Sequence, residues 1–302
     1  MWPQEVNWNS LKFGVEIEFV GGDPERVELL PGWEMSLDEL QIDATGEESG
    51  SELKPPPMLW EERDQIRVML SRLQAQGASV NWSCGLHIHI GLEPWGQDIV
   101  LPLIDAALSY QHTIQALLQT SPHRLMFCPP VTPDMRKQYI TSPGEDAVRH
   151  RGRPQSHRCG INTAAWFDIG TVEIRYANGT VDYEEIVRTI ELCLRFVAAI
   201  GAGRSLPTDP AAMAQTLGVS ASGYPAQHPP PRWFQERLWL EDSLIPAVSR
   251  MAAELVPDGE IHHILPVADG ILVAIEVGEK LFKYVLQPPP FVDWKLVRQV
   301  IE

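Results

Sequence analysis

The sequence predicts an α+β fold built on a mostly antiparallel sheet, and three observations support this class. Strand-like and helix-like segments alternate along the 302 residues without an internal repeat. Several strand-like segments alternate between apolar and polar residues, as strands with one buried face do. Two of them, 159–167 and 171–179, are joined by the short turn "DIG", which is typical of antiparallel neighbours.

The expected elements follow from period-two and period-3.6 patterns and from turn residues. In order, they are strands over 11–20 and 32–40, a helix over 58–77, a strand over 79–91, a helix over 97–119, an irregular Pro-rich segment over 121–155, the two strands just named, and a helix over 183–202. The three helices would cover the apolar face of the sheet.

Composition then divides the chain. We expect residues 1–205 to form one catalytic domain, and residues 206–232, which are rich in Pro, Gly, Ser and Ala, to form a linker or extended arm. Residues 233–302 would form a C-terminal extension with a helix over 233–255, a hairpin over 271–286 and a terminal helix.

Charge and cysteine usage exclude several classes of protein. A net charge of −16 disfavours binding to nucleic acid or to an anionic membrane. The four cysteines are scattered, which is typical of reduced thiols in the cytoplasm. The first ten residues lack the pattern of a signal peptide, and no apolar run approaches the ~20 residues that span a membrane. We therefore expect a cytoplasmic location.

Three predicted strands each carry two ionisable side chains two residues apart, and such residues share one face of a strand. The three pairs are Glu16 with Glu18, His87 with His89, and Glu173 with Arg175. Clustered carboxylates are costly to bury unless cations neutralise them, and carboxylate and imidazole ligands suit Mg²⁺ or Mn²⁺. An arginine beside them suits a bridging anion, so the combination is typical of phosphoryl transfer.

Simpler interpretations stay open for each feature. A single Glu-x-Glu pair is usually a solvated strand face, and Glu-x-Arg is usually a surface ion pair. The basic segment 149–158 is either a solvated loop or an anion clamp. The sequence contains no Walker, Rossmann, nucleophile-elbow or zincin motif.

The order of five motifs resembles the amidoligase family, ATP-dependent carboxylate–amine ligases with a glutamine-synthetase-like fold. The motifs are "FGVEIEF", "WEMSLDEL" with "SGSELKPPP", "GLHIHIG", "HRCGINTAAW" and "TVEIRYANGTVD", which together span roughly residues 10–205. The resemblance implies a curved sheet around ATP and divalent metals, usually Mg²⁺ or Mn²⁺. It also implies an acyl-phosphate intermediate, which an amine converts into an amide or isopeptide bond.

The resemblance also implies roles for individual residues. The implied metal ligands are Glu16, Glu18, Glu52, His87 and Glu173, with Asp38 at a further acidic position. Glu52 would also act in catalysis. His89 would lie near the nucleotide phosphates, Arg175 would contact the γ-phosphate or acyl phosphate, and Arg158, with Asn162 nearby, would hold an anionic group. Lys54 departs from the family pattern, which commonly has a small hydroxyl residue there.

Two other functions remain open at this stage. A metal-dependent hydrolase could use the same Glu and His residues to generate a metal hydroxide. A non-enzymatic subunit that binds metal or nucleotide could also carry them. The carboxylate and amine substrates could be small molecules, peptides or proteins, and the sequence leaves the oligomeric state open.

Overall fold

A computed structural model gives the structure of the protein and describes residues 1–37, 41–42, 47–152, 156–278, 280–288 and 294–300. The described chain forms two compact units. The first unit comprises residues 1–150 and 156–229, and the second comprises residues 151–152 and the described part of 230–302.

The first unit is built on a six-stranded sheet with the order β2-β5-β1-β6-β8-β7. The strands are β1 (Phe13–Phe19), β2 (Glu34–Ser36), β5 (Ser51–Lys54), β6 (Gly85–Gly91), β7 (Ile161–Asn162) and β8 (Thr171–Asn178). Every neighbouring pair is antiparallel, which confirms the predicted antiparallel sheet of an α+β fold. A separate two-stranded ribbon joins β3 (Gln41–Ile42) to β4 (Glu48–Ser49).

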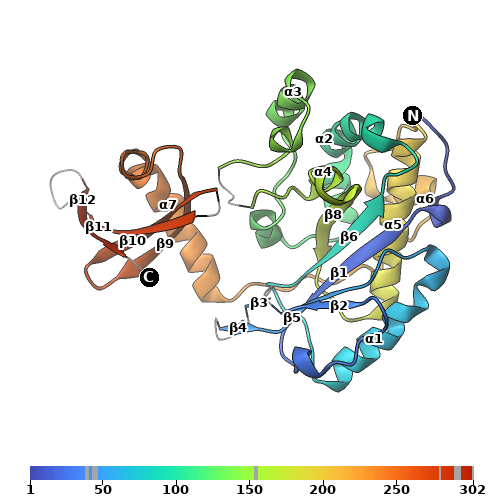
Figure 1. The fold of residues 1–302 in the computed structure, drawn as a ribbon, viewed down its shortest axis with the longest axis horizontal. Helices are drawn as coiled ribbons and strands as arrows, with labels where there is room; N and C mark the ends of the chain where they lie inside the picture. Colours follow the sequence, from blue (N-terminus) through green and yellow to red (C-terminus); the bar gives the residue numbers. More distant parts are fainter. Residues whose placement is uncertain (38–40, 43–46, 153–155, 279, 289–293, 301–302) are drawn as a thin grey trace. The chain divides into compact units, whose positions relative to one another are not determined.

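One face of this sheet packs against helices. The odd-numbered residues of β1, from Phe13 to Phe19, are buried in a core with the apolar sides of three helices, whereas its even-numbered residues are only half-buried. The helices are α1 (Asp64–Ala75), α2 (Val100–Leu117) and α5 (Tyr183–Gly201). The last two are close to the predicted ranges, whereas α1 begins at residue 64 rather than at 58. Figure 1 shows α5 running along the sheet, where it contacts β1 and β6. The opposite face is left for polar side chains.

Shorter helices complete the first unit. The α-helices are α3 (Pro133–Thr141), α4 (Ala165–Ile169) and α6 (Pro210–Leu217). The 3₁₀ helices are η1 (Trp8–Ser10), η2 (Pro24–Arg26), η3 (Trp60–Glu62), η4 (Gly96–Ile99), η5 (Pro122–Met126) and η6 (Glu145–Ala147).

Two predicted segments differ from the observed structure. The irregular segment 121–155 contains α3, whose first turn is favoured by a proline at its start and by the capping side chain of Thr132. The strand predicted over 159–167 is only two residues long, because the chain then turns into α4. Gly170, with φ of 72°, ends that helix in the left-handed conformation that favours glycine.

The segment predicted to be a linker or arm is instead folded into the first unit as far as residue 229. It contains α6, whose N-terminus is capped by the side chain of Asp209. Leu206, Met213, Leu217 and Tyr224 are buried in the core of the first unit. The composition of the segment is typical of a linker, but burial of these apolar side chains anchors it in the first unit.

The second unit has one long helix, α7 (Arg232–Leu255), and a four-stranded antiparallel sheet with the order β12-β11-β10-β9. Its strands are β9 (Glu260–Val267), β10 (Gly270–Val277), β11 (Lys280–Gln287) and β12 (Lys295–Val300). The predicted helix and hairpin are therefore present. The prediction of a terminal helix is wrong, because residues 295–300 form a strand that pairs with β11. Among the described residues, no helix is long and apolar enough to span a membrane.

Candidate active site

The polar face of the six-stranded sheet carries a continuous row of functional side chains. Residues on directly opposite positions of antiparallel strands project to the same face. The observed partners are Glu52 with Glu18, Glu16 with His87, His89 with Glu173, and Glu173 with Asn162. The three pairs predicted from the sequence therefore lie on one face, across neighbouring strands.

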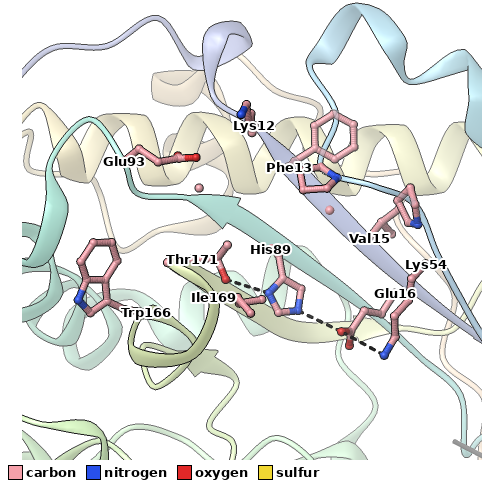
Figure 2. Close-up of a pocket in the computed structure, with 15 residues that line it drawn as sticks. Lys12, Phe13, Val15, Glu16, Lys54, His89, Glu93, Trp166, Ile169 and Thr171 are labelled. Carbon is pink, nitrogen blue, oxygen red and sulfur yellow. Dashed lines mark hydrogen bonds and ion pairs between the residues drawn. The ribbon is translucent and has the colours of Figure 1, made fainter. Parts of the chain in front are cut away.

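Glu16 lies at the centre of the row, between the two imidazoles. Its Oε2 atom is 3.0 Å from His87 Nδ1, and its Oε1 atom is 3.3 Å from His89 Nε2. On the far side of the imidazoles, Glu173 Oε1 is 3.7 Å from both His87 Nδ1 and His89 Nε2. Figure 2 shows His89 between Glu16 and Thr171, whose hydroxyl oxygen is 3.0 Å from His89 Nδ1.

Glu173 is held from two further sides. The guanidinium of Arg175 contacts its Oε1 atom, and Asn162 Nδ2 donates a hydrogen bond of 2.8 Å to its Oε2 atom. Both Glu173 and Arg175 are buried. Arg175 Nε is buried and has no hydrogen-bond partner among the described residues.

Glu52 and Glu18 have different surroundings. The ammonium group of Lys54 contacts Glu52 and lies 3.8 Å from Glu16 Oε1. Glu18 instead accepts a hydrogen bond from the backbone N–H of Gly85, and its Oε1 atom is 3.7 Å from His87 Nε2. Glu18 is thus tied to the start of β6, away from the centre of the row.

The pKa values of the cluster follow from these contacts. Burial alone would raise the pKa of both Glu16 and Glu173, but the imidazoles hold the pKa of Glu16 far below its usual range, and Arg175 lowers the pKa of Glu173 to about 2. Burial and the charge of Glu16 raise the pKa of Glu52 to about 7. Burial would lower the pKa of His89, but Glu16 and Glu173 raise it. Negative charge therefore dominates the site.

Two groups of three side chains bring ligand atoms within 4.8 Å of one another, as a metal ion requires. The first, called here the His89 group, is Glu16, His89 and Glu173; the second, called the His87 group, is Glu16, Glu52 and His87. His89 Nε2 lies 3.3 Å from Glu16 Oε1 and 3.7 Å from Glu173 Oε1, so an imidazole nitrogen and two carboxylate oxygens converge as metal ligands do. Carboxylate and imidazole donors suit Mg²⁺ or Mn²⁺.

These groups differ from the expected assignments in two respects. His89, expected beside the nucleotide phosphates, shares a candidate metal group with two carboxylates. Glu18, expected to bind a metal ion, belongs to neither group within the described residues. Asp38 lies outside the described residues.

Two cavities meet at the row. One, of about 490 Å³, is walled largely by apolar side chains such as Pro55, Trp166 and Ile169; Figure 2 shows Trp166 and Ile169 with His89 among the residues that line it. The other, of about 450 Å³, is lined by charged and polar side chains, including Glu52, Arg149, Arg158, Asn162 and Glu173. Glu16, Lys54 and His89 line both cavities. The site therefore offers an apolar chamber next to a charged one.

The basic segment 149–158 contributes to the charged cavity. Arg158 is exposed and lines this cavity together with His157 and Arg149, which forms an ion pair with Glu145. An anion clamp requires that side chains of this segment line the cavity. Arg149, His157 and Arg158 meet this requirement, which favours an anion clamp over a solvated loop.

Sequence reasoning missed two residues that the same rule could have found. Lys54 is two residues from Glu52, and Thr171 is two residues from Glu173, so each shares a strand face with a predicted site residue. In the sequence, Lys54 stands out only as a departure from the family pattern, and the hydroxyl of Thr171 is not a titratable group.

Comparisons with known proteins place the chain in a family. No match was found among curated proteins. Among solved structures, the chain is similar to one described as "Crystal structure of the complex between Prokaryotic Ubiquitin-like Protein Pup and its Ligase PafA", with 13% identity, a TM-score of 0.28, and coverage of 70% of this chain and 51% of that chain. The family model described as "Putative amidoligase enzyme" matches residues 26–197, more than half of the chain. The protein therefore belongs to the family of putative amidoligase enzymes.

Proposed function

We propose that the protein is an ATP-dependent carboxylate–amine ligase, which joins a carboxylate and an amine through an acyl phosphate with the help of Mg²⁺ or Mn²⁺. The observation that carries this proposal is the row of facing carboxylates and imidazoles, in which Glu16 and His89 line two cavities and Glu173 is held by the buried Arg175. Family membership supports the ligase class.

The two cavities suit the parts of a nucleotide. An apolar cavity of about 490 Å³ falls within the usual ~300–1,000 Å³ of small-molecule sites, and its walls, such as Trp166 and Pro55, suit an aromatic base. A base held there would direct its phosphates toward Glu16 and His89, where the cavities meet. The charged cavity would then receive the carboxylate and the amine.

The metal ion would be held by the His89 group, whose three donors leave open positions for phosphate oxygens. When bound, it neutralises charge on the phosphates and offsets the repulsion between the carboxylates of the site. Asn162 and Arg175 fix the orientation of Glu173, and Thr171 fixes the ring of His89.

Arg175 would act on the transferring phosphoryl group. In phosphoryl transfer, positioning and charge stabilisation supply most of the catalysis. The carboxylate oxygen attacks the γ-phosphorus of ATP, the bond to the β-phosphate oxygen breaks, and ADP leaves. The guanidinium of Arg175, which holds Glu173 from within the sheet, would stabilise the charge of this transition state.

The second step forms the amide. The amine attacks the carbonyl carbon of the acyl phosphate, inorganic phosphate leaves with the electrons of the broken C–O bond, and the amine loses a proton. Glu52 lines the charged cavity and could accept that proton, while the exposed Arg158 could hold an anionic group of the substrate.

A chain of this type needs no protein nucleophile. Cys84, which lies next to the site, is buried, and burial raises the pKa of its thiol to about 12. Cys159 is buried in the same way, with a pKa of about 12. Neither thiol is a reactive thiolate, since reactivity requires a lowered pKa. This favours a mechanism that activates the substrate instead.

The proposal is tested by incubating the protein with Mg²⁺, ATP and a panel of amino acids and dicarboxylic acids, with hydroxylamine as a substitute amine. We expect ADP and a hydroxamate to appear together, and only when a carboxylate is present, because hydroxylamine attacks acyl phosphates. If the protein cleaves amides without nucleotide, and ADP appears in none of the mixtures, it is a hydrolase instead.

A further inference from the structure

We propose that Lys54 serves as a tethered cation in the His87 group, so that the protein binds one divalent ion, at the His89 group, rather than two. This inference deepens the proposed function, since it concerns the metal requirement of the same site. It rests on three observations: the position of the ammonium group, the charge of the cluster, and the sharing of Glu16 by both groups.

The position of Lys54 is the first observation. Its ammonium group contacts Glu52 and lies 3.8 Å from Glu16 Oε1, and these two residues are the carboxylate ligands of the His87 group. The Lys54 side chain is 31% exposed, compared with 5% for that of Glu52, so the charge reaches a largely buried carboxylate from the cavity side. A divalent ion in this group would have to displace the ammonium from both oxygens.

The charge of the cluster is the second observation. Lys54 is in ion-pair contact with Glu16 and Glu52, the two carboxylates of the His87 group. Arg175 contacts Glu173 in the His89 group. Removing Lys54 would take a positive charge from the carboxylates of the His87 group, and a divalent ion there would then be favourable.

The sharing of Glu16 is the third observation. Its Oε2 atom is 3.0 Å from His87 and its Oε1 atom is 3.3 Å from His89, so it is a ligand candidate in both groups. Two divalent ions bridged by one carboxylate repel each other unless further anions surround them. An ammonium with a single charge in the His87 group lessens that repulsion, and the His89 group keeps its full set of donors.

The experiment counts bound ions in the full chain without nucleotide, by isothermal titration with Mn²⁺ and by electron paramagnetic resonance of the free Mn²⁺. We expect one tight Mn²⁺ per chain for the wild type and two for Lys54→Ser and Lys54→Met. Lys54→Arg keeps the positive charge and should bind one. Lys137→Met, which removes an exposed lysine on α3, is the matched control and should also bind one.

The thermal response gives a second readout that does not depend on catalysis. Lys54→Met keeps most of the aliphatic stem, and saturating Mn²⁺ should raise its melting temperature more than that of the wild type, since two ions bind the native state. Equal stoichiometry and equal thermal response in the wild type and Lys54→Met would overturn the role of Lys54, as would two ions in the wild type. If one ion binds in every variant, only this inference fails. If no variant binds Mn²⁺, the metal dependence of the proposed function fails with it.

Discussion

Two strands of this protein carry paired histidines, and only one pair lies in a candidate site. On β6, His87 and His89 are two residues apart, share a face, and meet carboxylates from both neighbouring strands. On β9 of the second unit, His262 and His263 are adjacent, and a bulge separates the pairing of His263 with Ala274 from the next pair. Their rings contact each other, with 2.8 Å between the Nδ1 atoms.

The pKa values show what the surroundings do to the same side chain. Burial lowers the pKa of His263 to about 4, and the charges of His262 and Arg237 act in the same direction. Burial acts on His89 as well, but Glu16 and Glu173 outweigh it and raise its pKa. Within the described part of the second unit, no group of three ligand side chains assembles. A pair of histidines therefore indicates a site only when the neighbouring strands supply carboxylates.

The largest effect is expected at Arg175, which contacts Glu173 beside the histidines of β6. Arg175→Ala should reduce ATP-dependent ligation by ~10²–10³, because it removes a charged donor from the transition state. Arg175→Lys should restore activity only in part, since it keeps the charge but loses the two-pronged geometry. Steady-state turnover of ADP gives the measurement.

Arg298→Ala is the control for this prediction. Arg298 forms an exposed ion pair with Asp269 in the second unit, so the variant should leave turnover unchanged. Mn²⁺ binding to both Arg175 variants should persist. Full activity in Arg175→Ala would remove this residue from the phosphoryl-transfer step.

The next effect separates Glu16 from Glu18. Mn²⁺ should raise the melting temperature of the wild type, and Glu16→Gln should abolish the rise, because Glu16 belongs to both candidate groups. Glu18→Gln should keep most of the rise, since Glu18 is held by the backbone of Gly85. The resemblance to the amidoligase family implies the same role, metal ligation, for both residues. A lost response in Glu18→Gln with a normal response in Glu16→Gln would reverse our assignment.

This distinction shows where sequence-based prediction ends. Side chains alternate between the two faces of a strand, and this depends only on positions within the strand. That Glu16 and Glu18 share a face, as do His87 and His89, could therefore be predicted. Which glutamate faces the histidines depends on the register between β1 and β6, and a shift of two residues would exchange them. Register follows from the packing of the whole sheet, which no local pattern contains.

The same dependence on contacts between distant parts of the chain explains the errors in the predicted fold. The helix predicted at the C-terminus is the strand β12, which is mostly exposed and depends on pairing with β11. The segment 206–229 resembled a linker in composition, but burial of Leu206 and Met213 fixes it in the first unit. In contrast, α5 and α7 were predicted within one residue at each end, because their apolar periodicity is long.

A smaller effect is expected at Thr171, whose hydroxyl contacts His89 Nδ1 and so fixes the orientation of the imidazole ring. Thr171→Val removes the hydroxyl and leaves a side chain of the same shape. We expect Mn²⁺ affinity to fall by about 10- to 100-fold, the usual cost of losing the partner of a ligating histidine. Isothermal titration measures this. Thr216→Val, which removes an exposed hydroxyl on α6, should leave the affinity unchanged.

The smallest effect concerns the stability of the metal-free protein against pH. The pKa of Glu52 is raised from about 4.5 to about 7, so the native state binds more protons than the unfolded chain between these pH values. The pKa of His89 is raised above 6.5, which extends this excess of bound protons above pH 6.5. Stability should therefore fall as pH rises through this window. The lowered pKa values of Glu16 and Glu173 act oppositely, so stability is also lost as pH falls below about 4.5.

Melting temperatures measured from pH 4 to pH 8 in the presence of a chelator test this dependence. Glu52→Gln should flatten the decline above pH 5, because glutamine does not titrate. Added Mn²⁺ should stabilise the protein more at pH 8 than at pH 6, since His89 must lose its proton to bind metal. A melting temperature that rises steadily between pH 5 and pH 8 without metal would contradict the raised pKa values.

The most direct test of the account is pulsed electron paramagnetic resonance of bound Mn²⁺, which detects nitrogen ligands. We predict nitrogen coupling from one imidazole in the wild type and in His263→Ala, and its loss in His89→Gln at Mn²⁺ concentrations that still load the site. Nitrogen coupling that survives in His89→Gln, or that is absent from the wild type, would contradict the claim that β6 supplies the metal-binding imidazole through His89.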